Sequence, residues 1–229
     1  MASKAEVITD VRRLLDEQAA NGSGFVLDDS SATQTDADDT ELDSLIENRI
    51  VEARNFVLGG CDAGLLQAGS DIESLTASTP TAITRDGATV GQRYTVSSVL
   101  RLVRAQCPSW YRDITEFVDM GSADYTMLQD GISSGTAVTP KGASGHLASS
   151  STMTVEVYAG TTYASMALYG VKIYALSALG SDVKVSSGPL YSALVNYIAG
   201  LVCLSLGDER SDNFMHLATT YMGAQGSER

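Results

Sequence analysis

Helical periodicity at both ends of the chain, on either side of a β-like middle, is the feature that most constrains the fold. Residues 3–20 carry apolar side chains at steps of three and four, and the same spacing recurs at about 40–60, 189–207 and 208–223. Such a helix must bury its apolar face. We therefore expect the helices from the two ends to pack against each other.

The middle of the chain, from about Asp71 to Leu179, has a different composition. Thr, Ser, Val, Tyr and Gly dominate, and turn signals such as Asp86-Gly87 separate short apolar runs. We interpret the Gly- and Ser-containing segment 141–146 as a loop and expect a single helical turn at 125–129. Strands are expected over 95–104, 112–118, 153–158 and 167–176.

These patterns predict an α+β fold class with two parts. Residues 1–70 and 185–223 are expected to form a helical bundle, and residues 74–180 an inserted β-sandwich-like domain. Residues 224–229 are expected to be a C-terminal tail. In this interpretation Ser3 and Glu6 form a capping box, Gly207 ends one helix and Asp208 caps the next.

The charge of the chain excludes two classes of partner. It has 28 acidic and 15 basic residues, a formal net charge of −13, and the first 60 residues alone carry 13 acidic and 5 basic residues. Nucleic-acid backbones and anionic membranes are bound mainly by Lys and Arg, so tight binding to either is not expected. No apolar run reaches the ~18 residues of a membrane span, and no membrane association is predicted.

No catalytic, cofactor or metal site is predicted, and the chain is not expected to be an enzyme. The three cysteines are far apart and show no CxxC spacing, and neither His146 nor His216 has a ligand partner at helical spacing. The acidic run at 36–43 lacks the glycine of a calcium loop. A nucleophile elbow and a phosphate loop are both missing, although catalytic sites also assemble from residues far apart in sequence.

One cluster of basic and aromatic residues is a candidate interface. Arg101, Arg104 and Arg112 lie close in the chain to Trp110 and Tyr111, and Trp, Tyr and Arg are the residue types that dominate binding energy at protein interfaces. Tyr197 and Tyr221 are further candidates in the C-terminal helices. A strand face whose arginines pair with acids such as Glu116 is the alternative interpretation.

Several short segments resemble one family of virion proteins. The runs 94–96, 99–103 and 108–116 resemble the β-rich part of a virion ring (head–tail adaptor) protein of crAss-like bacteriophages. The segments 124–129 and 139–141, and the helix 194–201 with the last helix ending near Tyr221, resemble its continuation. The Gly- and Ser-rich stretch from Gly131 to Ser151 departs from the family pattern.

The resemblance implies a structural virion subunit in the neck or tail region, made in the host cytoplasm. Such subunits form a homo-oligomeric ring, about twelve-fold, below the portal protein and next to further ring or tail proteins. Genomic DNA passes through the ring without specific binding, and the family has no active site. Acidic channel walls would repel the phosphates of the DNA. We therefore expect the following acidic residues to face the channel or the portal: Asp36, Asp38, Asp39, Glu41 and Asp43.

Three other functions are left open by the sequence. The chain could be another virion component associated with the tail or a fibre, although a tail-tube protein would be mostly β. It could be a cellular enzyme whose site is not recognisable from motifs. It could also carry a ligand- or carbohydrate-binding module on the β-rich segment, although its single tryptophan argues against a sugar-stacking platform.

Overall fold

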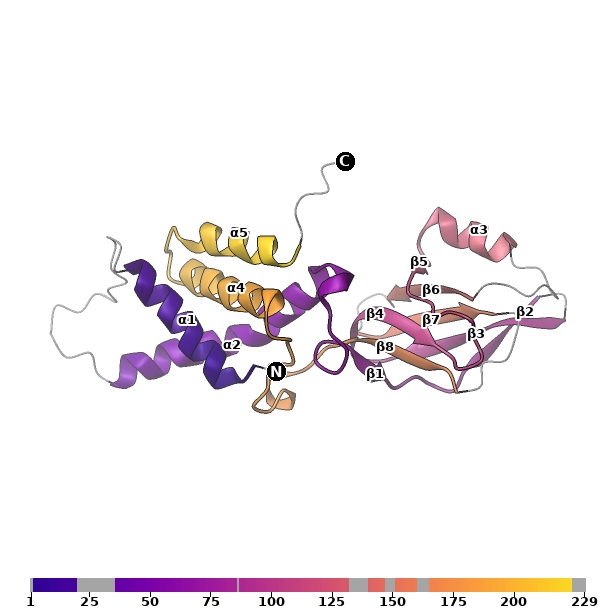
Figure 1. Ribbon diagram of the computed structural model, residues 1–229, viewed down its shortest axis with the longest axis horizontal. Coiled ribbons are helices and arrows are strands. Elements are labelled where there is room, and N and C mark those ends of the chain that lie inside the picture. Colours follow the sequence, from indigo (N-terminus) through magenta and orange to yellow (C-terminus); the bar gives the residue numbers. More distant parts are fainter. Residues whose placement is uncertain are drawn as a thin grey trace. The chain divides into compact units, whose positions relative to one another are not determined.

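The computed structural model describes residues 2–19, 36–85, 87–131, 140–146, 151–159 and 165–223. The chain divides into two compact units: residues 1–71 with 174–229, here called the helical unit, and residues 72–173, here called the β unit (Figure 1). The mixed α+β class is confirmed. From the sequence, we expected the borders between the two parts at 70–74 and 180–185. The compact units of the structure meet at 71/72 and 173/174. The expected tail at 224–229 lies outside the described residues.

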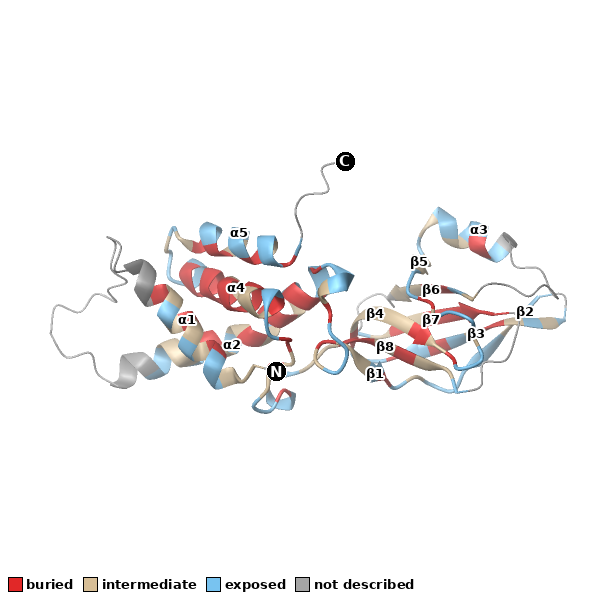
Figure 2. Cartoon of the chain, viewed as in Figure 1, coloured by how far each residue is buried: buried red, intermediate tan, exposed pale blue. Residues whose placement is uncertain are grey.

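Helix α4 is the centre of the helical unit. The helices are α1 (Lys4–Ala19), α2 (Asp36–Gly60), α4 (Pro189–Ser205) and α5 (Ser211–Tyr221), with short 3-10 turns η1 (Ala63–Leu65) and η2 (Leu176–Ala178). Helix α4 packs against α5, α2 and α1. Because it has neighbours on several sides, apolar residues are buried around most of its circumference. The ribbon of α4 is accordingly mostly red in Figure 2.

The helix termini confirm one expected cap and correct two other expectations. Ser3 and Glu6 form the capping box, with the Glu6 N–H donating to Ser3 Oγ at 3.2 Å and the Ser3 N–H to Glu6 Oε2 at 2.7 Å. Helix α2 begins at Asp36 and not near Thr40, since the acidic run forms its first turn, where negative charge suits the helix dipole.

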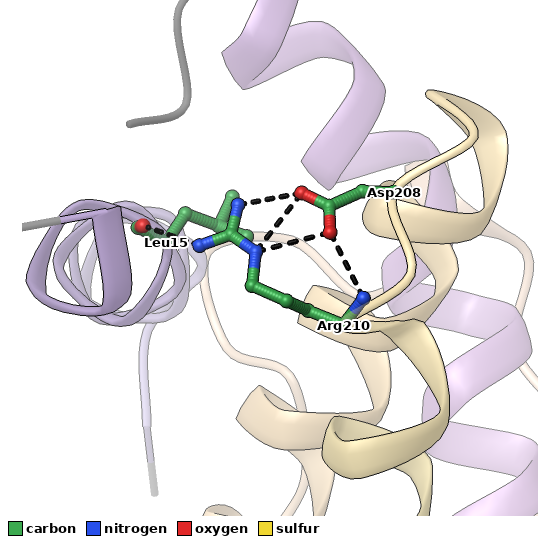
Figure 3. Close-up of polar contacts among 3 residues, drawn as sticks. All are labelled: Leu15, Asp208 and Arg210. Atoms are coloured by element: carbon green, nitrogen blue, oxygen red, sulfur yellow. Dashed lines mark hydrogen bonds and ion pairs between the residues drawn. The ribbon is translucent and has the colours of Figure 1, made fainter. Parts of the chain in front are cut away.

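Asp208 does not cap α5. That helix follows Arg210 without a side-chain cap, and Asp208 binds Arg210 instead, with 2.6 Å between its Oδ2 and Nη2 (Figure 3). The Arg210 guanidinium also donates to the Leu15 carbonyl of α1 at 3.4 Å. Gly207 ends α4 as expected, with a φ of 72° that suits a residue without a Cβ. The charged pair therefore fixes the α4–α5 turn against α1.

The described strands of the β unit form two sheets. They are β1 (Glu73–Leu75), β2 (Thr81–Arg85), β3 (Ala88–Val96), β4 (Val99–Gln106), β5 (Phe117–Asp119), β6 (Lys141–His146), β7 (Met153–Tyr158) and β8 (Ala167–Lys172). One sheet has the order β2-β3-β7-β6-β5 and the other the order β1-β8-β4. An apolar cluster joins residues of both sheets, including Val96 and Val155 of the first and Leu75 and Leu168 of the second.

The strand from 153 to 158 is confirmed as β7, but the other expected strands are corrected. The expected strand 95–104 is two strands, because Ser98 has a φ of 56° and turns the chain from β3 of one sheet into β4 of the other. Of the expected strand 112–118, only Phe117 and Val118 lie in a sheet strand, β5, which continues to Asp119. The strand expected over 167–176 ends at Lys172. Strands β1 and β2 were not expected.

The segment 141–146, interpreted as a loop, is strand β6 between β5 and β7. Its glycines are needed for packing, since a Cβ at Gly142 would lie 2.6 Å from the Phe117 ring. The expected turn at 125–129 is helix α3 (Ala123–Gly131), which follows β5.

The chain enters and leaves the β unit through paired strands. Strand β1 is antiparallel to β8, and Lys172 Nζ lies 3.5 Å from Glu73 Oε2. In the helical unit, the buried Asp71 accepts from the N–H of Ser186 at 2.6 Å and of Gln67 at 2.8 Å. The outgoing and returning segments are therefore held together on both sides of the border.

A buried carboxylate organises the five-stranded sheet and α3. Glu156 of β7 is 1% exposed, and its Oε1 lies 2.6 Å from Arg93 Nη2 of β3. Its Oε2 accepts from the hydroxyls of Tyr125 of α3, at 2.7 Å, and of Tyr158. Burial alone would raise the pKa of Glu156, but these hydrogen bonds from Tyr158, Tyr125 and Arg93 outweigh it, so the pKa is lowered.

We expect the substitution Glu156→Gln to lower the free energy of unfolding of the β unit by about 2–4 kcal/mol, because it removes the charge from a buried, fully bonded acceptor. Because the folded-state pKa lies below the ordinary value of 4.5, the stabilisation is complete above that pH and is lost as the pH falls through the lowered pKa. Urea unfolding followed by the fluorescence of Trp110 measures both effects. The exposed Glu116→Gln is the control, and equal stability of the two variants would contradict the assignment.

We expect Asp71→Ala to destabilise the helical unit by about 2–4 kcal/mol, because the buried Ser186 N–H loses its acceptor. Urea unfolding followed by circular dichroism at the helix minimum measures this loss. Glu209→Ala, which removes an exposed carboxylate of the same unit, should leave the midpoint unchanged. A midpoint for Asp71→Ala equal to that of the control would show that Asp71 does not hold the two segments.

Candidate functional site

A bulge in β4 places two of its arginines on the same face of the three-stranded sheet. Arg101 and Arg104 are three residues apart, which in a regular strand would point them in opposite directions. The register against β8 shifts between Leu102 and Arg104, so that Arg101 pairs with Val171 and Arg104 with Tyr169. Both arginines therefore lie on the face opposite Leu168 and the shared core.

Arg104 is fixed by two neighbours. Its guanidinium carbon lies 4.6 Å from the centre of the Tyr169 ring, in a cation–π contact. Its Nη1 lies 3.8 Å from Asp113 Oδ2, so the alternative interpretation, in which the strand arginines pair with acids, holds for this residue, with Asp113 and not Glu116. Both side chains are partly exposed, so the ion pair contributes little to stability and mainly sets the orientation of the guanidinium.

The loop after β4 presents Tyr111 to solvent from a rigid base. The backbones of Ala105 and Ile114 exchange two hydrogen bonds of 2.9 Å, which close the loop, and Trp110 packs against the apolar cluster of the β unit. Tyr111 at the tip is 98% exposed, and Arg112 is exposed beside it. We name Arg101, Arg104, Tyr111, Arg112 and Tyr169 the Arg–Tyr face.

A groove of about 540 Å³ lies next to this face. The segment 112–116, helix α3 and the start of β6 line it. Its apolar lining includes Met127 and Leu128, and charged residues of both signs, among them Arg112 and Lys141, surround them. Arg112 belongs to both features, and Asp113, which contacts Arg104 of the face, also lines the groove. This mixture suits contact with a polypeptide better than binding of a highly charged ligand.

The structure brings together only some of the predicted interface residues. Arg101, Tyr111 and Arg112 belong to the Arg–Tyr face, and Trp110 supports the loop from inside. Tyr197 and Tyr221 belong to the helical unit, on α4 and α5, so they are not part of this face. The place of Tyr169 beside Arg104 was not predicted, because it depends on pairing between strands more than 60 residues apart, which no local pattern reveals.

The predicted acidic group lies at the start of α2. Glu41 is exposed, and Asp43 Oδ1 lies 2.6 Å from Arg12 Nε of α1. Asp36, Asp38 and Asp39 form the first turn, and their side chains lie outside the described residues. Which of these residues faces a channel or a portal stays a prediction.

Other candidate chemistry gives no further site. Cys61, Cys107 and Cys203 are free and buried, and burial raises the pKa of Cys203 to about 11, which disfavours its nucleophilic thiolate form. Within the described ranges, no three His, Cys, Asp or Glu residues are grouped so that they could hold a metal ion. None of the described helices combines the length and the apolar character needed to cross a membrane.

Comparison of the chain with protein-family models and with curated proteins found no match.

We expect Gly170→Ala to destabilise the β unit by about 2–3 kcal/mol, because a Cβ at this position would lie 2.4 Å from the Arg101 carbonyl oxygen and push β4 away from β8. Trp110 fluorescence during urea unfolding reports the loss. Gly121→Ala is the matched control, since its nearest contact would be an ordinary 3.5 Å. Unchanged stability for Gly170→Ala would show that the close approach of the two strands is not required.

Proposed function

We propose that this chain is a structural virion protein, a head–tail connector subunit that assembles as a ring below the portal and lines or supports the DNA channel. The proposal starts from the resemblance of residues 94–221 to the virion ring proteins of crAss-like bacteriophages. It includes the finer fold expected from the sequence, an adaptor-type helical bundle that carries an inserted β-sandwich-like domain. The described helices and the two sheets with their shared apolar cluster are compatible with that architecture.

One observation carries the proposal: the two units of a single chain offer chemically different surfaces. The helical unit holds 20 acidic and 8 basic residues, whereas the β unit holds 8 and 7 and carries the Arg–Tyr face. A closed ring requires each subunit to contact its neighbours through two different surfaces. The acidic unit also suits a channel wall, because it repels the phosphates of passing DNA and does not retain them.

A ligand-binding module on the β unit is the second candidate function, and the groove beside α3 favours it. The groove has the volume of a small-molecule or peptide site, and Met127 at its border is largely exposed. This function requires no ring, so oligomeric state distinguishes the two candidates.

We expect the purified chain, alone or with the portal protein encoded in the same genome, to form rings. Negative-stain electron microscopy shows the symmetry, expected to match that of the portal at about twelve-fold, and light scattering gives the mass. Mixing with an unrelated acidic protein of similar size is the control for non-specific association. A chain that stays monomeric under both conditions would exclude the connector function and favour the ligand-binding module.

A further inference from the structure

We propose that helix α3 is a releasable cover on one face of the five-stranded sheet, held closed by the hydrogen bond from Tyr125 to the buried Glu156. We call this hydrogen bond the latch. Release means that α3 leaves the sheet while the strands stay paired. The inference concerns the β unit alone and goes beyond the proposed ring, so its failure would leave the connector function untouched.

The covered face lies opposite the apolar cluster that the two sheets share. Along β7, Val155 and Val157 belong to that cluster, so Glu156 and Tyr158, which alternate with them, point to the other face. A second, smaller apolar cluster includes Tyr158, and α3 contributes Leu128 to it. The other members come from the strands and the segments next to them: Ile83, Val90, Val118, Met120 and Ala143. Helix α3 is therefore a layer over this face of the sheet.

Few contacts hold α3 in place. Among the side chains of α3 that the structure describes, only Leu128 is buried, and most of the helix is pale blue in Figure 2. Two polar contacts add to it: the latch, at 2.7 Å, and a hydrogen bond from Arg85 of β2 to the Gln129 carbonyl. An element with so few buried contacts opens at a lower free energy than the sheet beneath it.

The sheet satisfies Glu156 even without the latch. Arg93 of β3 lies directly opposite Glu156 in the register, with 2.6 Å between its Nη2 and Oε1. Tyr158 donates to Glu156 from the same strand, and the residue opposite on β6 is the uncharged Ala143. The carboxylate therefore keeps two of its three partners when α3 leaves, so release does not strand a buried charge.

The turn before α3 stays fixed to β5. The Asp119 carboxylate accepts from the Gly121 N–H at 2.8 Å, and the Asp119 carbonyl accepts from the Ser122 hydroxyl at 2.7 Å. Helix α3 has nine residues, fewer than the ~12–15 that an isolated helix needs in water. Once released, it therefore stays tethered at this turn and unwinds.

Release changes what this part of the β unit offers to a ligand or partner. Met127 and Leu128 line the groove described above, so the groove loses one of its walls. At the same time Tyr158 and Ala143, which pack in one cluster with Leu128, become accessible beside the Glu156 carboxylate. The groove and the covered face are therefore alternatives, one offered when α3 is docked and the other when it is released.

The latch depends on the charge of Glu156. Burial acts to raise the pKa of Glu156, but the hydrogen bonds from Tyr158, Tyr125 and Arg93 outweigh it and lower the pKa. Because Tyr125 is one of these donors, docking of α3 favours the ionised carboxylate. The hold of the latch is therefore complete above the ordinary value of 4.5 and is lost as the pH falls through the lowered pKa.

Amide hydrogen exchange of the full chain, followed by mass spectrometry at about pH 7, tests the release. We expect the amides of α3 to exchange faster than those of β7, at a rate that low urea concentrations do not change, because local release exposes little surface. Tyr125→Phe removes the latch and keeps the ring. It should speed exchange in α3 by about 10-fold, the loss expected for one hydrogen bond to a charged group, and leave β7 unchanged.

Thr126→Val is the matched control. It removes a hydroxyl from an exposed position of the same helix at nearly constant side-chain size and helix propensity, so α3 should exchange as in the wild type.

The same experiment at about pH 4, with rates corrected for the intrinsic pH dependence of exchange, tests the role of the charge. Helix α3 of the wild type should open more often than at about pH 7, because part of Glu156 is then protonated. Tyr125→Phe should respond less, since its helix has lost the link to Glu156. An equal response of the two proteins would show that the carboxylate does not act on α3 through Tyr125.

Three further results would overturn the inference, and none of them bears on the ring. Exchange in α3 as slow as in β7, with the same urea dependence, would show that the helix and the sheet unfold together. Unchanged exchange in Tyr125→Phe would show that the latch does not hold α3. An equal acceleration of α3 and β7 in this variant would show that Tyr125 stabilises the whole sheet and not the docking of the helix.

Discussion

The buried carboxylate of Asp71 is the interaction on which the two-unit organisation depends. A domain inserted into another requires its entry and exit segments to lie side by side. Where these segments leave the helices, their backbone N–H and C=O groups have no helical hydrogen-bond partners. Asp71 supplies acceptors for the N–H groups of Gln67 and Ser186, one from each segment. Just beyond, β1 and β8 pair their backbones as an antiparallel ladder, so the two segments are also joined inside the β unit.

Further buried polar groups reinforce the same region. Arg54 of α2 is almost fully buried, donates from Nε to the Val183 carbonyl at 3.1 Å and stacks 5.1 Å from the centre of the Tyr174 ring. The contact joins the returning segment to the C-terminal part of α2, in the same way that Arg210 joins the α4–α5 turn to α1. Buried arginines are costly without partners, so these contacts specify one arrangement of segments that apolar packing alone would not select.

The helices could be predicted from the sequence far better than the strands, for a physical reason. A helix is specified by contacts three and four residues apart, and the apolar spacing around Val7 or Ile198 is visible locally. Strand boundaries here depend on a turn at Ser98 and on glycines whose role is to admit a neighbouring ring, as at Gly142. The same limit applies to the site: local clustering identified Tyr111 and Arg112, whereas the place of Tyr169 beside Arg104 depends on pairing between strands distant in the chain.

The paired crossing also has a consequence for how such a chain can change over evolutionary time. The helical unit is interrupted at a point where two of its own segments are already hydrogen-bonded, between Asp71 and Ser186. A different insert whose ends lie equally close could occupy this position without altering how α1, α2, α4 and α5 pack. Recombination at this junction could therefore exchange surface properties wholesale while the helical scaffold is inherited unchanged.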